Sequence, residues 1–164
     1  MIKTTLAIVV NETNQQVLLG HKKVGFGKGK FTCIGGKIEP NEPPQDCVQR
    51  EFREESSLSL PKESFELVGF IAFKFPFHEG WGFDNYVYRV TDLNGGIPQE
   101  SNEIRPQWFP IDDLPWEQMW ADNRHWIKLA AQGQKFTAEF TYGKDGESLT
   151  AYHVKVVEEV QFLR

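Results

Sequence analysis

Three carboxylates in one short acidic segment constrain this chain more than any other feature. Glu51, Glu54 and Glu55 are separated by three and four residues, so a helix would gather all three on one side. So much negative charge on one helical patch is destabilising unless a cation lies among the carboxylates. Carboxylate oxygens are the ligands that hard divalent cations prefer. The segment therefore predicts a helix that carries a metal site.

Residues on either side predict the limits of this helix. Asn41 is a cap-like residue, and Pro43-Pro44 suit a first helical turn. Asp46 then lies near the positive end of the helix dipole. We expect the helix to continue to about Ser56.

The same helix has a predicted buried face. Val48 and Phe52 form an apolar stripe, and Glu51 and Glu55 border it on a helical wheel. The acids would then lie at the edge of the core. On this evidence alone, a solvated acidic helix with its arginines in ordinary ion pairs is an equally good interpretation.

A longer spacing favours the metal site. Gly36 is followed at fixed intervals by Glu42, by the run from Arg50 to Glu55, and by an apolar residue, Leu58. Six such identities would coincide by chance about once in 10⁷ starting points. The pattern resembles the Nudix box. It departs at Ser57, where the family usually has the glycine that ends the helix in a left-handed conformation, which serine adopts only with strain.

Composition indicates a small globular enzyme. The chain has 164 residues, 40% hydrophobic and 13% aromatic, which suits one domain, 1–164, with a real core. Its formal charge of −5 argues against binding to a nucleic-acid polymer or an anionic membrane. Cys33 and Cys47 lack disulfide or metal spacing, and no signal peptide or long apolar run occurs. We expect a monomeric cytoplasmic protein.

Residue patterns predict a mixed α+β fold. Segments rich in β-branched and aromatic residues indicate strands at 4–10, 16–22, 31–38, 65–75, 85–91 and 105–111. A second helix is expected over 114–131. Alternating segments at 135–142 and 148–157 flank a turn and predict a C-terminal β-hairpin. The glycine-rich loop 25–29 lacks the ending of a P-loop.

Beyond the box, the resemblance extends over nearly the whole chain to one Nudix branch, the animal-type MutT homologues. Its blocks fall at 17–20, 22–23, 25–27, 35–37, 103–106, 108–109 and 119–126. The resemblance implies an α/β/α sandwich with a mixed sheet and a divalent cation, usually Mg²⁺ and alternatively Mn²⁺. It also implies hydrolysis of oxidised purine nucleoside triphosphates to the monophosphate and pyrophosphate.

The family's metal and catalytic roles carry over by position. The carbonyl of Gly35 and the carboxylates of Glu51, Glu54, Glu55 and Glu103 would hold the metals. Glu55 is the candidate for helping to activate the attacking water, and the expected catalytic set is completed by Glu51, Arg50 and Glu42. Arg50 would orient Glu42 through a bidentate contact, and Lys22 or Lys37 would face phosphate.

The expected base pocket departs from the family. An asparagine and two consecutive aspartates usually read the oxidised purine, and here the matching residues are Thr32, Asp122 and Asn123. Hydrolysis should survive these changes, whereas selectivity is open. The complete set expected to contact the substrate is Thr5, Lys22, Phe26, Thr32, Ile34, Gly35, Gly36, Lys37, Phe73, Phe83, Trp120, Ala121, Asp122, Asn123 and Trp126.

Three functional hypotheses follow from these residues. The first is a Mg²⁺-dependent hydrolase of modified purine nucleoside triphosphates, such as 8-oxo-dGTP. The second is a Nudix hydrolase of another nucleoside diphosphate derivative, such as an ordinary nucleoside triphosphate or a nucleotide sugar. The third is a non-catalytic ligand sensor, against which the intact carboxylate cluster argues.

Overall fold

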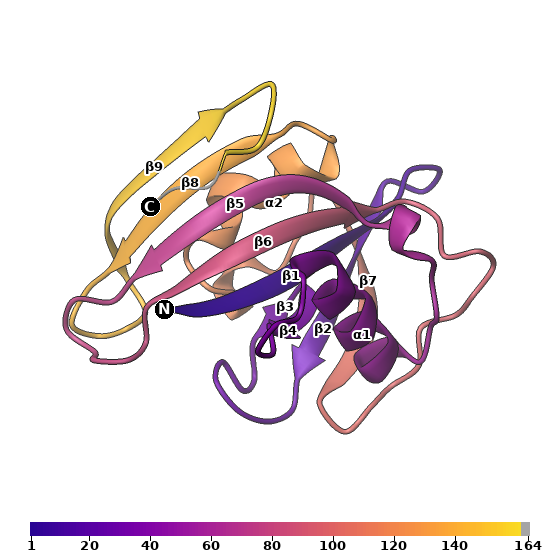
Figure 1. Ribbon diagram of the computed structural model, residues 1–164, viewed down its shortest axis with the longest axis horizontal. Coiled ribbons are helices and arrows are strands. Elements are labelled where there is room, and N and C mark those ends of the chain that lie inside the picture. Colours follow the sequence, from indigo (N-terminus) through magenta and orange to yellow (C-terminus); the bar gives the residue numbers. More distant parts are fainter. Residues whose placement is uncertain (162–164) are drawn as a thin grey trace.

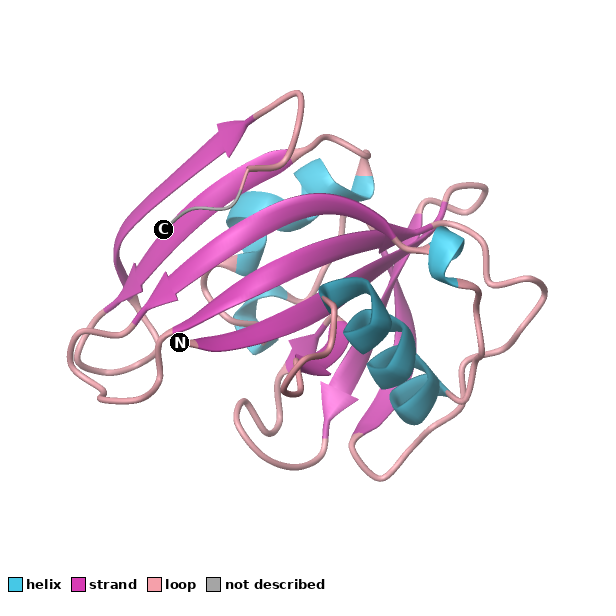
Figure 2. Cartoon of the chain, in the orientation of Figure 1, coloured by secondary structure: helices cyan, strands magenta, loops and turns pink. Residues whose placement is uncertain are grey.

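Alternating side chains on the first strand build two hydrophobic cores on opposite faces of one sheet. On β1 (Ile2–Asn11), Ile8 and Val10 belong to one buried cluster, while Ala7 and Val9 belong to the other. Successive side chains of a strand point to opposite faces, so this alternation places a core on each side. The computed structural model, which describes residues 1–161, shows this mixed sheet with its helices (Figures 1 and 2).

One helix covers each core. Helix α1 (Pro44–Ser56) packs Val48 and Phe52 into the cluster that holds Ala7. Helix α2 (Asn123–Ala131) packs Trp126 and Ile127 into the cluster that holds Ile8. Figure 1 shows α1 in front of the sheet and α2 behind it. The fold is therefore the α/β/α sandwich that the resemblance implies.

The sheet has nine strands in the order β3-β2-β1-β6-β5-β8-β9, with β4 paired to β1 and β7 paired to β2. Parallel pairing of β1 with β6 and of β5 with β8 makes the sheet mixed. The remaining strands are β2 (Gln16–Lys22), β3 (Phe31–Thr32), β4 (Ile34–Lys37), β5 (Glu66–Lys74), β6 (Phe83–Val90), β7 (Ile104–Pro110), β8 (Phe136–Tyr142) and β9 (Leu149–Val156).

The C-terminal hairpin is confirmed, because β8 and β9 pair antiparallel around a turn that contains Gly146 at φ 67°. The prediction of one domain over 1–164 stays a prediction, and its last three residues lie outside the described ones. Within residues 1–161, no helix is long and apolar enough to cross a lipid bilayer.

The strand expected over 31–38 is wrong as one element. The chain changes partner at Cys33, so that Phe31 pairs with His21 on β2 while Ile34 pairs with Ala7 on β1. One straight strand cannot follow both partners, because each partner requires its own hydrogen-bonding direction.

Two helix limits also differ from the prediction. Helix α2 begins at Asn123 instead of near Leu114, because Met119 has extended backbone and buries its side chain in the core. A short 3₁₀ turn, Trp116–Gln118, precedes it. At α1 the N-cap is Pro43, and Asn41 instead adopts φ 63° in the preceding turn.

Ser57 takes the left-handed conformation that the missing glycine would favour. Its backbone has φ 65° and ψ 14°, and its N–H donates to the carbonyl of Arg53 at 2.8 Å. The side chain is exposed. Serine therefore closes the helix as the family's glycine would, at a cost in strain.

We expect Ser57→Gly to stabilise the protein by about 0.5–1 kcal/mol, since the relief of left-handed strain exceeds the added chain entropy of glycine. Thermal unfolding should show a Tm about 1–4 °C higher. The matched control is Ser59→Gly at an exposed position without positive φ, which should not raise Tm. Equal effects at both positions would contradict the strain argument.

Candidate active site

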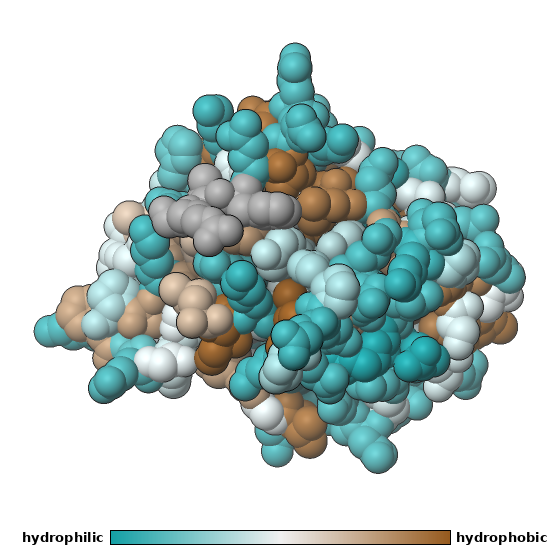
Figure 3. All heavy atoms as spheres, viewed as in Figure 1, coloured by the Kyte–Doolittle hydropathy of each residue, from teal (hydrophilic) through white to brown (hydrophobic). Residues whose placement is uncertain are grey.

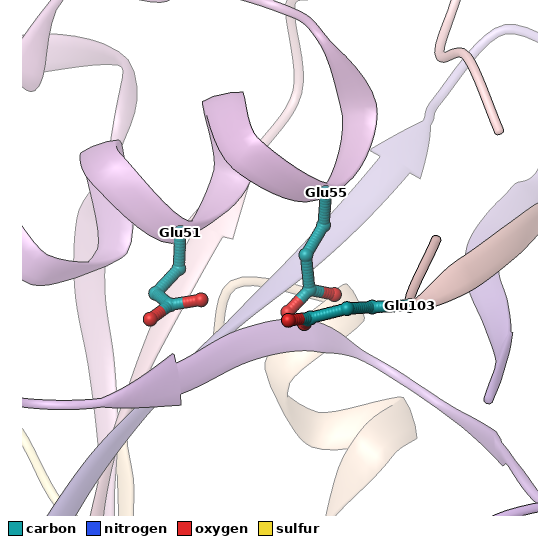
Figure 4. A group of neighbouring side chains, drawn as sticks. All are labelled: Glu51, Glu55 and Glu103. Atoms are coloured by element: carbon teal, nitrogen blue, oxygen red, sulfur yellow. The ribbon is translucent and has the colours of Figure 1, made fainter. Parts of the chain in front are cut away.

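Three carboxylates from two distant parts of the chain meet at one edge of α1. Glu51 and Glu55 extend from α1, and Glu103 extends toward Glu55 from the residue preceding β7 (Figure 4). One oxygen of each carboxylate lies within 4.8 Å of the others. This spacing fits three oxygen ligands around one hard cation.

The electrostatics of Glu55 also fit a cation. Glu55 is 6% exposed. Burial, followed by the charges of Glu103 and Glu51, raises the pKa of Glu55 from 4.5 to about 8. Carboxylates that repel one another in a desolvated place become compatible when a divalent cation joins them. The donor set therefore suits a divalent metal such as Mg²⁺.

Glycine at position 36 is what allows Glu51 to lie against β4. A Cβ atom on Gly36 would lie 2.3 Å from Cδ of Glu51, far inside contact distance. Gly35 is equally confined, because a Cβ there would meet the carbonyl oxygen of Thr5. Gly36 thus lets the β4 backbone lie beside the acidic helix, and Gly35, the predicted carbonyl ligand, lets it lie close against β1.

Arg50 joins the preceding loop to the carboxylate cluster. Its Nε and Nη2 donate to the two carboxylate oxygens of Glu42 at 2.7 and 2.9 Å, the predicted bidentate contact. Its Nη1 donates to Glu51 Oε1 at 2.8 Å. The bidentate contact with the Arg50 guanidinium lowers the pKa of Glu42 to about 2, so that Glu42 stays ionised. Arg50 therefore also orients one predicted metal ligand.

Glu54 lies apart from the other acids. Its side chain is 53% exposed and contacts Arg50 Nη1 at 3.4 Å, and it is not one of the three carboxylates that converge. The outer surface over α1 is mainly hydrophilic (Figure 3). Metal ligation by Glu54 stays a prediction.

A cavity of about 330 Å³ opens beside the carboxylate cluster. Glu55 and Glu103 line one part of it, with Lys22, Gly35, Gly36 and Lys37 among its lining residues. Aromatic side chains line much of the rest, and the predicted members among them are Phe26, Phe73, Phe83 and Trp120. The acidic cluster and the aromatic cavity are thus continuous.

Aromatic rings in this cavity are arranged in stacked pairs. Phe73 and Phe83 stack with ring centroids 4.6 Å apart, and Phe26 stacks on Trp120 at 5.0 Å. Phe26 remains 47% exposed, so it lies at the rim. Flat apolar walls of this kind suit a planar heterocyclic base.

A buried polar network surrounds Asp122 at the cavity. Oδ2 of Asp122 accepts hydrogen bonds from Trp126 Nε1 at 2.8 Å and from Asn123 Nδ2 at 3.2 Å. Its Oδ1 accepts a short hydrogen bond from the Tyr142 hydroxyl. Burial raises the pKa of Asp122, and these donors partly oppose that effect. Asp122, Asn123 and the third base-reading candidate, Thr32, all line the cavity.

Other members of the expected substrate-contact set are placed elsewhere. Ile34 is 1% exposed and packs in the core beneath α1, and Ala121 packs against the opposite core, so neither lines the cavity. Trp126 is likewise buried in the core and reaches the site only through Asp122. Thr5 does line the cavity, but its hydroxyl contacts Cys47 Sγ at 3.3 Å.

Several lining residues were missed at the level of sequence, including Tyr142, Trp81 and Asn85. No local signal marks Tyr142, which the fold brings to Asp122 from the end of β8. A signal did exist for Asn85. It alternates with Phe83 and Val87 on the face of β6 that carries apolar residues, where an amide is unusual.

Because metal-free Glu55 keeps its proton up to about pH 8, we expect metal-free protein to lose stability as pH rises from about 4.5 to 8. In that range the folded state holds a proton that the unfolded chain has released, so the free energy of unfolding falls with pH. Glu55→Gln has no such proton. Its Tm advantage over wild type, measured in EDTA, should grow between pH 5 and pH 8.

The other carboxyl with a strongly shifted pKa beside the cluster, Glu42, does not contribute to this pH dependence. Its pKa is lowered to about 2, so its contribution is fully present above pH 4.5 and does not change in the tested range. A Tm difference between wild type and Glu55→Gln that is independent of pH would contradict the elevated pKa of Glu55.

Comparisons with known proteins agree with this geometry. The family model of the NUDIX domain matches residues 1–130. An α/β/α sandwich whose acidic helix borders a cavity defines a class of metal-dependent hydrolase, and this chain belongs to the Nudix family. Nudix hydrolases generally use a divalent metal.

Relatives within the family are close over most of their length. The chain is 36% identical to the mouse oxidized purine nucleoside triphosphate hydrolase over 154 residues, 94% of both chains. It is 40% identical to the zebrafish (Danio rerio) protein of the same name over 138 residues, 84% of this chain and 85% of that one. The crystal structure of a MutT protein from Bacillus halodurans superposes with a TM-score of 0.75 at 26% identity, covering 94% of this chain and 97% of that one.

Proposed function

We propose that this protein hydrolyses oxidised or otherwise modified purine nucleoside triphosphates, of the 8-oxo-dGTP type, to the monophosphate and pyrophosphate. In this role it would remove damaged precursors from the nucleotide pool before they enter DNA. The names of the mouse and zebrafish relatives support this substrate class.

One observation carries the proposal. A single cavity is lined by two members of the carboxylate cluster, Glu55 and Glu103, and also by stacked aromatic rings and the buried polar network of Asp122. A nucleotide has the same three parts, namely a charged phosphate chain, a planar base and a polar base edge. The cavity therefore matches a nucleotide along its length.

Each part of the site has a proposed task. Glu51, Glu55 and Glu103, with Glu54 and the Gly35 carbonyl, would hold Mg²⁺ or Mn²⁺. When bound, the cation supplies positive charge against the phosphates and acidifies water for attack on phosphorus. Glu55 would act as the base for the attacking water, and Lys22 and Lys37 would contact phosphate oxygens.

The Arg50–Glu42 pair holds this arrangement together. Arg50 fixes Glu51 through Nη1 while its other nitrogens are engaged by Glu42, so the carboxylate of Glu51 has one orientation. Restricting a ligand in this way reduces the reorganisation needed when substrate and cation bind.

Initial rates on a substrate panel test the proposal. Purified protein with Mg²⁺ would be assayed on 8-oxo-dGTP, 2-oxo-dATP, O6-methyl-dGTP, dGTP and dATP, with kcat/KM and pyrophosphate release as readouts. A preference for a modified purine with pyrophosphate as product supports the proposal. Comparable rates on all five would instead favour the second hypothesis, and no cleavage of any of them would direct the search to nucleotide sugars or to a ligand sensor.

Thr32 and Asn123 keep that second hypothesis open, because they replace two polar readers of the family's base pocket. A sensor would show ligand-induced thermal stabilisation without turnover of any compound. We also propose a monomeric protein of the cytoplasm that binds no nucleic-acid polymer. Its two free, buried cysteines and its acidic charge support this environment.

A further inference from the structure

Asn85 has an unused hydrogen-bond acceptor at the base cavity. It lines the cavity, is 2% exposed, and lies on β6 beside Thr4 of β1. Among the described residues, its Oδ1 is the buried side-chain nitrogen or oxygen atom without a hydrogen-bond partner. A buried acceptor without a partner lowers the stability of the folded protein. Its position in a residue that lines a cavity indicates that a bound ligand donates the missing hydrogen bond.

The neighbouring hydroxyl fixes which end of the amide is free. Thr4 Oγ1 donates to the carbonyl oxygen of Asp84 at 3.2 Å, which uses its proton. Thr4 Oγ1 must therefore accept from Asn85, and it does so from Nδ2 at 2.7 Å. In this arrangement Nδ2 faces Thr4, and Oδ1 is the atom of the amide that has no partner.

Asp122 differs from Asn85 in this respect. Its two carboxylate oxygens already accept three hydrogen bonds from Tyr142, Trp126 and Asn123. Most of its capacity to accept hydrogen bonds is therefore used within the protein. The oxygen of Asn85 keeps its whole capacity for a donor that arrives with the ligand.

Oxidation of a purine creates a donor of the required kind. In an ordinary purine the ring nitrogen next to the site of oxidation is an acceptor, and its lone pair would repel Oδ1. When the adjacent carbon becomes a carbonyl, as at C8 of 8-oxoguanine, that nitrogen carries N–H. A buried acceptor in the pocket thus attracts the oxidised base and disfavours its parent.

We propose that Asn85 is a specificity-determining residue whose Oδ1 accepts a hydrogen bond from the ring N–H that oxidation adds to the purine. This inference rests on the proposed function and deepens it. Asn85 would then supply part of the base selectivity that the family obtains from the residues replaced here by Thr32 and Asn123.

Asn85→Leu tests the inference, because leucine keeps the branching at Cγ and removes both polar atoms. We expect kcat/KM for 8-oxo-dGTP to fall about tenfold, while that for dGTP stays the same or rises, because the repulsion between Oδ1 and the lone pair of the unoxidised base is removed. In EDTA, the Kd of 8-oxo-dGMP should rise about tenfold and that of dGMP should not. Tm should change little, since the loss of the hydrogen bond from Nδ2 to Thr4 is offset by the removal of an unpaired buried acceptor.

Two further variants complete the design. If the Asn85→Leu variant does not fold, Asn85→Val provides the same test, because valine strongly favours β-strands. Thr137→Val is the matched control, a buried polar-to-apolar change on β8 of the same sheet and outside the cavity lining. It should leave the ratio of the two substrates unchanged.

Equal losses for 8-oxo-dGTP and dGTP would overturn the inference, because Asn85 would then contact a group common to both. A lower Tm with an unchanged substrate ratio would also overturn it and make Asn85 a structural residue. Failure of the proposed function is distinguishable from either result. In that case the wild-type protein would not hydrolyse 8-oxo-dGTP, and monophosphate binding would still report on Asn85.

Discussion

Replacement of Glu55 by glutamine is expected to lower kcat on the preferred nucleotide by about 10³-fold. Glutamine has the same shape but cannot accept the proton of the attacking water or contribute charge to the cation site. Glu55 is the buried member of the cluster that it forms with Glu51 and Glu103, so its loss removes the least solvated carboxylate of the site. Steady-state turnover with saturating Mg²⁺ measures the loss.

Binding should survive this substitution. The aromatic walls of the cavity and the Asp122 network do not depend on Glu55, so nucleotide should still raise Tm. The matched control is Glu63→Gln, an exposed acid outside the cavity, which should retain wild-type turnover. Turnover of Glu55→Gln within a few fold of wild type would remove Glu55 from the catalytic mechanism.

The second large effect is expected from Gly36→Ala, which should lower kcat/KM by about 100-fold. The added methyl would overlap Cδ of Glu51, whose backbone is fixed within helix α1. Glu51 must therefore swing away from Glu55 and Glu103. A displacement of about 1 Å in a catalytic group is enough for a loss of this size.

Metal affinity should weaken in parallel, by about 10- to 100-fold in titrations followed by thermal shift. Gly82→Ala is the matched control, because its added methyl would meet its nearest neighbour, the Phe73 carbonyl oxygen, at an ordinary 3.5 Å. Circular dichroism establishes that both variants fold. If Gly36→Ala folds and keeps full activity, the position of Glu51 does not limit the reaction.

Local patterns predicted the acidic helix and its packing well. Helical spacing alone placed Val48 and Phe52 in the core, with Glu55 at its border, and the structure confirms this arrangement. Such predictions succeed because side chains three and four residues apart on a helix are neighbours whatever surrounds them. The hairpin of β8 and β9 was predictable for a similar reason, since its turn and its alternation are both local.

Predictions failed where a residue's surroundings come from distant segments. Helical periodicity over 114–131 could not show that Met119 would leave the helix for the core. Ile34 was included in the expected substrate-contact set, and the pairing of β4 with β1 turns its side chain into the core beneath α1. Which face of the sheet a strand residue occupies depends on the register of its strand, and this register is set by the partner strand.

The sequence by itself determined the acidic helix, because helical spacing is a property of one short segment. It also determined the family, whose resemblance is carried by short blocks of residues and implies the α/β/α architecture. Only the tertiary structure decided that Glu103 reaches Glu55, that Tyr142 holds Asp122, and that the Asn85 oxygen has no partner. Each of these facts is a meeting of segments far apart along the chain. Their distances follow from sheet order and register, which no local pattern contains.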